Sequence, residues 1–315
     1  MKIICSKSSL LKSVSIALKA VPSKTTMPIL ECILMDATTN QIKFTTNDME
    51  LGIETIVEGT IEEKGRVALD AKIFYEIIRR LPDNDITIKT DEKYTATITC
   101  EKAKFNIPGK SGEDFAYLPM IEKDEPLTIS QYTLKEMIRQ TIFSIAVNEN
   151  NKLMTGELFE IKNNCLKVVS LDGHRIAIRK MPLKREYSDR KVVVPGKTLS
   201  EVSKILSGEV DDQVSIYFTK NHILFEFDQT MVVSRLIEGE YFRIDQMLSS
   251  DYETKLKINK KEFLDCIDRA TLLVREVDKK PIIINITDDD MELRIDSAMG
   301  SMNEEIDIEK RVKIL

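Results

Sequence analysis

Hydrophobic and polar positions along this chain alternate with two different periods. Helical spacing of apolar residues predicts five amphipathic helices, over residues 7–20, 70–81, 130–147, 196–206 and 259–276. Between them lie short apolar or alternating runs that predict strands, over residues 29–35, 42–46, 86–89, 95–100, 191–194, 214–218 and 222–227. Asparagine and aspartate predict hairpin turns at Asn40, Asn163–Asn164, Asn221 and Asp288–Asp290. The pattern favours an α+β fold with helices on one face of antiparallel sheets.

The same order of elements recurs along the chain. Equivalent landmarks are spaced by about 125 residues, namely Leu10, Leu134 and Phe263 in helices, Ile42, Leu166 and Met291 in strand pairs, Lys72 and Lys197 at helix starts, and Phe115 and Phe242 in similar tetrapeptides. A repeat this long buries its own core, so it predicts domains at 1–120, 127–248 and 253–315. The last is expected to be half a copy, which leaves apolar faces uncovered at residues 282–286 and 291–295.

Composition indicates an ordinary globular protein. Hydrophobic residues make up 42% of the 315 residues and charged residues 31%, and no apolar run is long enough for a membrane span or a signal peptide. The five cysteines, Cys5, Cys32, Cys100, Cys165 and Cys266, are widely spaced and form no Cys-x-x-Cys pair. They predict reduced core residues of a cytoplasmic protein, with no disulfide frame, no metal site and no cofactor.

Charge is distributed unevenly. The net charge of −6 argues against a nucleic-acid partner. The five predicted helices nevertheless sum to about +6, which leaves the remainder at about −12. These helix faces could simply be solvated. If they share one surface, that surface is basic and attracts a polyanion such as DNA, while the rest of the molecule repels it.

One segment has the composition of a hydrolase site. Ser170, Asp172 and His174 lie within five residues of one another. Catalytic triads, however, are assembled from distant chain positions, and the sequence has no Gly-x-Ser-x-Gly elbow, Walker loop or metal-spaced His/Cys set. The alternative is an Asp-Gly turn between two strands, with His174 and Arg175 at its edge.

Several short motifs together resemble a known family. They are Leu171–Ala177 (LDGHRIA), Met27–Leu30 after Lys24, Phe143–Ser144 leading to Thr155–Gly156, Val194–Pro195 before Lys197, Asn47–Asp48 and Leu236–Gly239. In register over the whole chain, they resemble the bacterial β sliding clamp, the processivity subunit of DNA polymerase III. The resemblance implies repeated DNA-clamp domains, with helices lining a central hole and antiparallel sheets outside. It also implies a homodimeric ring with no catalytic site, which tethers the replicative DNA polymerase to double-stranded DNA by encircling it.

The resemblance implies three sets of functional residues. Contact with DNA is expected at Lys24, Lys72, Asn148, Lys152 and Lys197, although Asn151 stands where the family often has an arginine. A pocket for peptides of polymerases, the clamp loader and repair proteins is expected between the second and third domains, from Met154, Leu171, Gly173, His174, Arg175, Ile176, Phe242 and Met247. The ring interface is expected at Lys102, Lys104, Phe105 and Ile107 against Leu272, Leu273, Glu304 and Glu305.

The end of the chain departs from this family pattern. A full third copy would need about 60 more residues, including the tail that completes the peptide pocket. We therefore expect a C-terminally truncated clamp, as a fragment, a frameshifted copy or a natural short form. The alternative function is a truncated relative that binds DNA or partner peptides without closing a ring.

Overall fold

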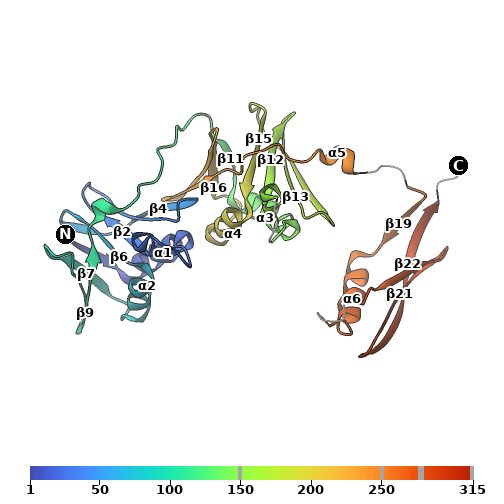
Figure 1. Ribbon diagram of the computed structural model, residues 1–315, viewed down its shortest axis with the longest axis horizontal. Coiled ribbons are helices and arrows are strands. Elements are labelled where there is room, and N and C mark those ends of the chain that lie inside the picture. Colours follow the sequence, from blue (N-terminus) through green and yellow to red (C-terminus); the bar gives the residue numbers. More distant parts are fainter. Residues whose placement is uncertain (148–150, 249–251, 276–279, 313–315) are drawn as a thin grey trace. The chain divides into compact units, whose positions relative to one another are not determined.

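The computed structural model (Figure 1) describes residues 1–147, 151–248, 252–275 and 280–312. The chain forms two compact units, Met1–Tyr241 and Phe242–Leu315. Within the described ranges, no helix is long and apolar enough to cross a membrane.

The first repeat of the larger unit contains ten strands and two α-helices. They are β1 (Lys2–Ser6), α1 (Lys7–Ala17), β2 (Cys32–Asp36), β3 (Ile42–Asn47), β4 (Leu51–Val57), β5 (Thr60–Glu63), β6 (Arg66–Asp70), α2 (Ala71–Arg80), β7 (Asp85–Thr90), β8 (Ala96–Cys100), β9 (Ala103–Ile107) and β10 (Gly109–Lys110). Short 3-10 turns lie at Leu18–Ala20, Pro28–Glu31 and Gly112–Asp114. Helix α1 begins after Ser6, whose hydroxyl accepts the Ser9 N–H at 3.2 Å, and such a cap satisfies an otherwise unpaired amide.

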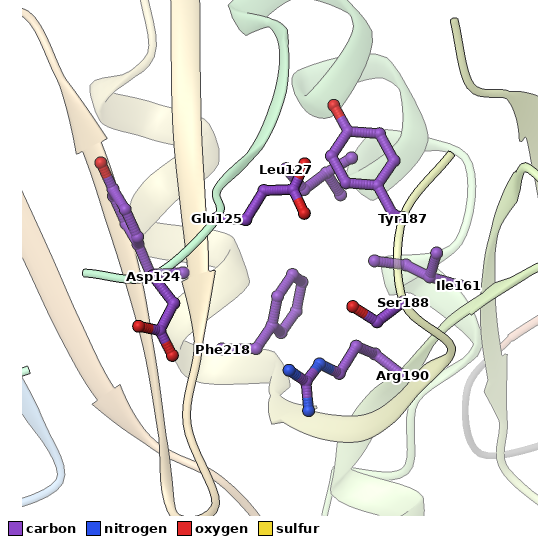
Figure 2. A pocket seen from close by; sticks show the side chains of 9 residues that line it. Asp124, Glu125, Leu127, Ile161, Tyr187, Ser188, Arg190 and Phe218 are labelled. Carbon is purple, nitrogen blue, oxygen red and sulfur yellow. The ribbon is translucent and has the colours of Figure 1, made fainter. Parts of the chain in front are cut away.

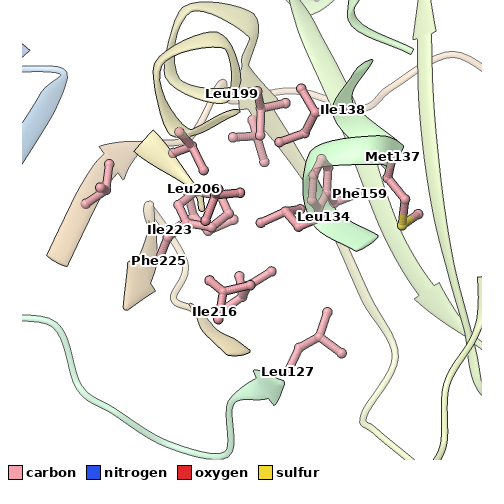
Figure 3. Packing of buried hydrophobic residues seen from close by; sticks show 14 of the residues in the cluster. Leu127, Leu134, Met137, Ile138, Phe159, Leu199, Leu206, Ile216, Ile223 and Phe225 are labelled. Carbon is pink, nitrogen blue, oxygen red and sulfur yellow. The ribbon is translucent and has the colours of Figure 1, made fainter. Parts of the chain in front are cut away.

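The second repeat has the same order of elements, without counterparts of β5 and β10. It contains β11 (Leu127–Ser130), α3 (Gln131–Arg139), β12 (Gly156–Lys162), β13 (Cys165–Leu171), β14 (Ile176–Pro182), β15 (Arg190–Pro195), α4 (Gly196–Ile205), β16 (Gln213–Phe218), β17 (His222–Phe227) and β18 (Thr230–Arg235). Short 3-10 turns lie at Ile142–Ser144 and Lys152–Thr155. Ser130 caps α3 as Ser6 caps α1, by accepting the Thr133 N–H. Helices α3 and α4 bury Leu134 and Leu199 against strand residues such as Phe159 and Ile216 (Figure 3).

Three antiparallel sheets support these helices. The first repeat has a five-stranded sheet, in the order β5-β1-β7-β8-β9. The second repeat has a four-stranded sheet, in the order β14-β13-β12-β15. A nine-stranded sheet, β10-β6-β2-β3-β4-β18-β17-β16-β11, runs through both repeats. Its central pair joins β4 to β18 with Thr230 opposite Thr55 and Ser234 opposite Leu51, so the two repeats share one backbone ladder.

The described residues of the smaller unit form one sheet and one long helix. Its elements are α5 (Ile244–Met247), β19 (Thr254–Ile258), α6 (Lys260–Thr271), β20 (Ile283–Ile286), β21 (Asp290–Ser297) and β22 (Gly300–Val312), with strand order β19-β22-β21-β20. Met291 and Leu293 of β21 pack with Cys266 of α6 and are buried. The expectation of an uncovered face over residues 291–295 is therefore wrong. On β20, by contrast, Ile283 and Ile284 are exposed.

Two helices are shorter than their apolar spacing predicts. The helix expected over 130–147 ends at Arg139, because the amide of Thr141 turns back to Ile138 and its hydroxyl caps the carbonyl of Met137. The helix expected over 259–276 ends at Thr271, and the next amides make the tighter bonds of a 3-10 turn. The segment expected as a strand over 29–35 begins with a 3-10 turn at Pro28–Glu31. The hairpin turn at Asn163–Asn164 is confirmed, and both residues have positive φ.

Candidate functional site

The turn between β13 and β14 is built around Asp172. Its Oδ1 accepts the backbone N–H groups of His174 and Arg175, both at 3.1 Å. Its Oδ2 lies 2.9 Å from Nε of Arg175. The pKa of the Asp172 carboxyl is lowered, chiefly by the His174 amide and also by Arg175. Gly173 has a φ of +85°, a conformation that favours glycine, and no atom lies where a side chain would begin.

The same turn exists in the first repeat, where its aspartate pairs with a lysine of the second repeat. Asp48 follows β3 as Asp172 follows β13, and its Oδ1 accepts the N–H groups of Glu50 and Leu51 at 3.0 and 2.7 Å. Its other oxygen pairs with Nζ of Lys197, at the start of α4 in the second repeat. The Asp48 side chain is 6% exposed and that of Lys197 is 59% exposed, so the ammonium group at the tip of Lys197 is held by the first repeat.

Ser170 belongs to the core and not to a catalytic site. Its side chain is fully buried, and its Oγ donates to the Thr141 carbonyl at 2.5 Å. The first repeat has the equivalent bond, from Thr46 Oγ1 to the Ala17 carbonyl. Because Ser170 has a structural partner and its neighbour Asp172 serves the turn, the hydrolase interpretation is wrong.

The residues expected to bind peptides lie in two units. Met154, Leu171, Gly173, His174, Arg175 and Ile176 belong to the larger unit, and Phe242 and Met247 to the smaller one. Leu171 is fully buried at the end of β13, whereas His174 and Arg175 are exposed. The Arg175 guanidinium lies 5.5 Å from the centre of the Phe143 ring. Phe143 is 56% exposed, and sequence reasoning used it only as part of a motif.

Four lysines expected at DNA are exposed at defined positions. Lys72 and Lys197 are the second residues of the equivalent helices α2 and α4. Lys24 lies in the loop between α1 and β2. Lys152 is exposed at the start of a 3-10 turn. Asn148 lies outside the described residues.

The residues expected at a ring interface lie on an edge strand and after a helix. Lys104, Phe105 and Ile107 are on β9, at one edge of the five-stranded sheet, and Lys102 is in the turn before it. Phe105 is 40% exposed. Leu272 caps the C-terminus of α6 and is 76% exposed, and Leu273 follows it outside the helix.

The acids expected opposite Lys102 and Lys104 differ in their surroundings. Glu304 Oε2 lies 2.9 Å from Nε of Arg269, and this ion pair lowers the pKa of the Glu304 carboxyl. Glu305 is exposed. Among the described residues, Glu304 therefore has an ion-pair partner within its own unit and Glu305 has none.

A buried carboxyl group escaped the sequence reasoning. Glu157 on β12 is fully buried, and neither of its carboxyl oxygens has a hydrogen-bond partner among the described residues. Burial raises its pKa to about 8, and the Thr141 hydroxyl acts weakly in the opposite direction. The equivalent residue in the first repeat is Ile33, also fully buried. A residue-by-residue alignment of the two repeats would have revealed Glu157, because it stands where the first repeat has an isoleucine.

Within the parts of the chain that the structure describes, no group of three or more His, Cys, Asp or Glu side chains could hold a metal ion. All five cysteines are free thiols, and four of them are buried.

Comparisons with known proteins agree with this architecture. Residues 1–119 match the N-terminal domain of the DNA polymerase III beta subunit, and residues 128–242 match its central domain. The beta sliding clamp of Staphylococcus aureus is 34% identical over 299 residues, which cover 92% of this chain and 79% of the relative.

Solved structures of the same kind superimpose closely. A putative DNA polymerase III beta subunit from Eubacterium rectale has 69% identity and a TM-score of 0.97, over 99% of this chain and 85% of that one. The DNA polymerase sliding clamp of Bacillus subtilis has 33% identity and a TM-score of 0.95, with the same coverage. The repeated α+β fold is thus the sliding-clamp fold. The chain belongs to the family of bacterial β sliding clamps, the non-catalytic processivity subunits of DNA polymerase III.

Proposed function

We propose that this chain is a DNA sliding clamp subunit that encircles duplex DNA, tethers the replicative DNA polymerase to it and docks peptides of partner proteins. The observation that carries the proposal is the matching position of Lys72 and Lys197. Each is the exposed second residue of an equivalent helix in successive repeats. Two lysines at equivalent positions of successive repeats support a basic surface, and such a surface would follow the regular phosphate backbone of a duplex.

Contacts with DNA would be few and weak. Lys24, Lys152 and Asn148 would join Lys72 and Lys197 at the phosphates. Each phosphate contact contributes through release of counterions and reads no sequence. Because a closed ring cannot leave the duplex sideways, such contacts suffice, and their weakness lets the ring slide. The ion pair of Lys197 with Asp48 would hold one of these cations at a fixed place at the joint of the two repeats.

Peptides would dock beside the turn between β13 and β14. Met154 and Ile176, both partly exposed, would supply apolar surface, whereas Leu171 is fully buried. The resemblance also assigns Phe242 and Met247 to peptide binding. Arg175, fixed by Asp172 and stacked on Phe143, would act as the polar anchor. The partners would be the polymerase, the clamp loader and repair proteins that carry clamp-binding peptides.

Two copies would close the ring through unlike surfaces. The edge strand β9, with Phe105 and Ile107, would pack on Leu272 and Leu273 of the other copy. Lys102 and Lys104 would lie near Glu305. Apolar residues flanked by opposite charges suit a head-to-tail contact that closes by rotation.

A topological assay tests the proposal directly. The chain is loaded by a clamp loader onto nicked circular DNA and separated from free protein by gel filtration. Encirclement predicts that the chain stays on the circle in high salt and leaves within minutes once the DNA is cut to a line. Equal retention on circular and linear DNA would support the alternative, a relative that binds DNA without closing a ring.

A further inference from the structure

The buried Glu157 is surrounded by hydroxyl groups of the second repeat. The register of β12 and β13 places it beside Ser170. The hydroxyls of Thr141 and Tyr241 also lie near its carboxyl group, since each of these residues and Glu157 influence one another electrostatically. All four side chains are buried. The acid therefore has polar neighbours, although its own oxygens accept no hydrogen bond among the described residues.

Each of these hydroxyls already donates to a backbone carbonyl. Thr141 Oγ1 donates to a carbonyl of the last turn of α3 at 2.8 Å. Ser170 Oγ donates to the Thr141 carbonyl at 2.5 Å, and the Tyr241 hydroxyl donates to the Val169 carbonyl at 3.4 Å. A hydroxyl has one proton to donate. None of the three can therefore donate to the buried acid without giving up its present bond.

These surroundings suit a neutral acid rather than a carboxylate. A carboxylate in an apolar interior is costly unless cations or hydrogen-bond donors surround it. The residue opposite Glu157 on β15 is Val194. The charged side chains on the elements packed against β12 are exposed or joined in ion pairs, namely Lys152, Lys167, Arg190, Lys191, Lys197, Glu201 and Lys204. A charged Glu157 would have no cation to pair with at its present place.

Burial keeps the proton on Glu157 at neutral pH. It raises the pKa of the carboxyl group to about 8, and among the described residues no charged side chain contributes to the shift. Tyr241, the titratable neighbour, is neutral as well, because burial and, to a smaller extent, Glu157 raise its pKa. Glu157 therefore changes its charge within about one pH unit of neutrality.

Two cavities approach β12 without reaching Glu157. The one shown in Figure 2 meets β12 at Ile161 and is lined by Phe218 on its other side. Another, of about 670 Å³, is lined by Val193 and Tyr241. Glu157 lines neither cavity. Once charged, it must draw hydrogen bonds from the hydroxyls around it, or displace them to admit water.

The same hydroxyls support the surface proposed for peptide docking. Thr141 leads from α3 into the 3-10 turn that carries Phe143. Ser170 stands two residues before Asp172, which fixes Arg175 in the turn after β13. The bond from Ser170 to Thr141 joins these two segments, and Arg175 stacks on Phe143 across them. The stacked pair is thus held in place by bonds that lie next to Glu157.

We propose that Glu157 is a proton switch for the peptide surface beside the turn between β13 and β14, an inference that rests on the proposed docking function. With Glu157 neutral, the hydroxyls of Thr141 and Ser170 hold the 3-10 turn and β13 together, so that Arg175 stacks on Phe143. With Glu157 charged, these hydroxyls turn to the carboxylate and release their carbonyls. The two segments then separate and the stacked pair is lost. Docking is tightest while the proton is bound.

The first repeat shows the same arrangement without the acid. Ile33 takes the place of Glu157 and is fully buried. The Thr46 hydroxyl makes the bond equivalent to that of Ser170. The fold of a repeat therefore does not need the acid, and Glu157→Ile should fold.

A single tryptophan tests the switch without any ligand. The chain has no tryptophan, and residue 143 is 56% exposed, so Phe143→Trp introduces one indole without crowding. Its fluorescence should change in one step with a midpoint near pH 8, where Glu157 titrates. Glu157→Gln and Glu157→Ile in this background should each remove the step, whereas Glu160→Gln on the same strand should keep it. A step that survives both Glu157 substitutions, or no step in the parent, would overturn the proposal.

Peptide titration separates the switch from the docking function. A labelled synthetic clamp-binding peptide of the replicative polymerase is titrated into the 315-residue chain at pH 7 and pH 9. Its affinity should fall about tenfold, as the neutral fraction of an acid with a pKa of about 8 does. Glu157→Gln and Glu157→Ile should bind equally at both pH values. Equal affinity in the parent would overturn the switch and leave docking intact. Absence of binding at both pH values would overturn the docking function, and the switch with it.

Discussion

The hydroxyl oxygens of Thr55 and Thr230 lie 3.0 Å apart, at the pair of strands where the first repeat joins the second. Thr55 is 2% exposed and Thr230 is 4% exposed. The two residues are directly opposite in the β4–β18 ladder, so one hydrogen bond between side chains reinforces the backbone bonds of the joint. Each hydroxyl is satisfied because the other is present.

This pair predicts a non-additive effect of substitution. Thr55→Val leaves the Thr230 hydroxyl buried without its partner, and should lower the free energy of unfolding by about 1–3 kcal/mol. Thr55→Val with Thr230→Val removes both polar groups and should cost less than the two single substitutions together. Urea denaturation of the four proteins checks the cycle. Additive losses would mean that the hydroxyl pair contributes no coupling energy.

Glu157 predicts a loss of stability with rising pH. Its pKa in the folded chain is raised by burial to about 8, from an ordinary value of 4.5. The folded state therefore holds a proton that the unfolded state has released, and the free energy of unfolding falls between about pH 4.5 and pH 8. The slope from this one group is at most about 1.4 kcal/mol per pH unit. Glu157→Ile, which copies Ile33 of the first repeat, should flatten the curve and stabilise the chain most at pH 8.

The matched control for this substitution is Glu160→Gln on the same strand. Glu160 is partly exposed and pairs with Lys167 at 3.5 Å. Glu160→Gln should leave unchanged the fall in the free energy of unfolding with rising pH. A Glu157→Ile curve parallel to that of the parent would show that Glu157 titrates at its ordinary pKa.

The proposed DNA surface predicts a change in salt dependence. Substitution of Lys24, Lys72 and Lys197 with alanine should reduce the slope of log affinity against log salt by up to about three, because each lost phosphate contact releases about one counterion fewer. The control substitutes three exposed lysines on strands and turns, Lys93, Lys180 and Lys220. A smaller slope in the first variant alone places its lysines at the DNA. Equal slopes would move the interface elsewhere.

The ion pair between Asp48 and Lys197 predicts a variant that binds DNA more tightly. Asp48→Asn keeps the oxygen that accepts the Glu50 and Leu51 N–H groups, so the turn is preserved. It removes the negative charge beside Lys197, and this should increase DNA affinity at low salt. The gain should vanish in Asp48→Asn with Lys197→Ala. A gain that persists without Lys197 would instead reflect the net charge of the chain.

The proposed ring contact predicts a weaker dimer. Phe105→Ala with Leu272→Ala removes two exposed apolar side chains, each worth on the order of 2 kcal/mol when buried at an interface. The dissociation constant of the dimer should rise about thirtyfold for each. Met120→Ala, at a residue that is 98% exposed, is the control. Sedimentation equilibrium at micromolar concentration measures all three proteins, and unchanged association would exclude these two residues from the contact.

Local features were predictable from the sequence where local chemistry decides them. The turns at Asn163–Asn164 and at Asp172–Gly173 follow from residues that tolerate positive φ or accept nearby amides. Helix ends were less predictable. Apolar spacing continues past Arg139 to Val147, but Val147 is 86% exposed, and the side-chain bonds of Thr141 end the helix first.

Features that depend on distant pairing were not predictable. Nothing in β4 or β18 alone indicates that Thr55 faces Thr230, because strand register across such a separation is set by the whole packed structure. The burial of Glu157 likewise depends on distant parts of the chain. A glutamate in an alternating strand indicates a solvent-facing residue, whereas Glu157 lies near Thr141 and Tyr241, which come from distant parts of the chain. The expected roles of the lysines and of Leu272 came from a resemblance, and stay predictions.

The shared sheet also bears on how the length of such a chain can vary over evolutionary time. One residue gained or lost in β4 or β18 would turn every following side chain to the opposite face of the ladder. The segment between the two repeats has no such constraint at its middle, where Met120 is almost fully exposed. Insertions and deletions should therefore accumulate in that segment and be removed from the joint. The register between β4 and β18 therefore constrains the two repeats more strictly than the linker between them does.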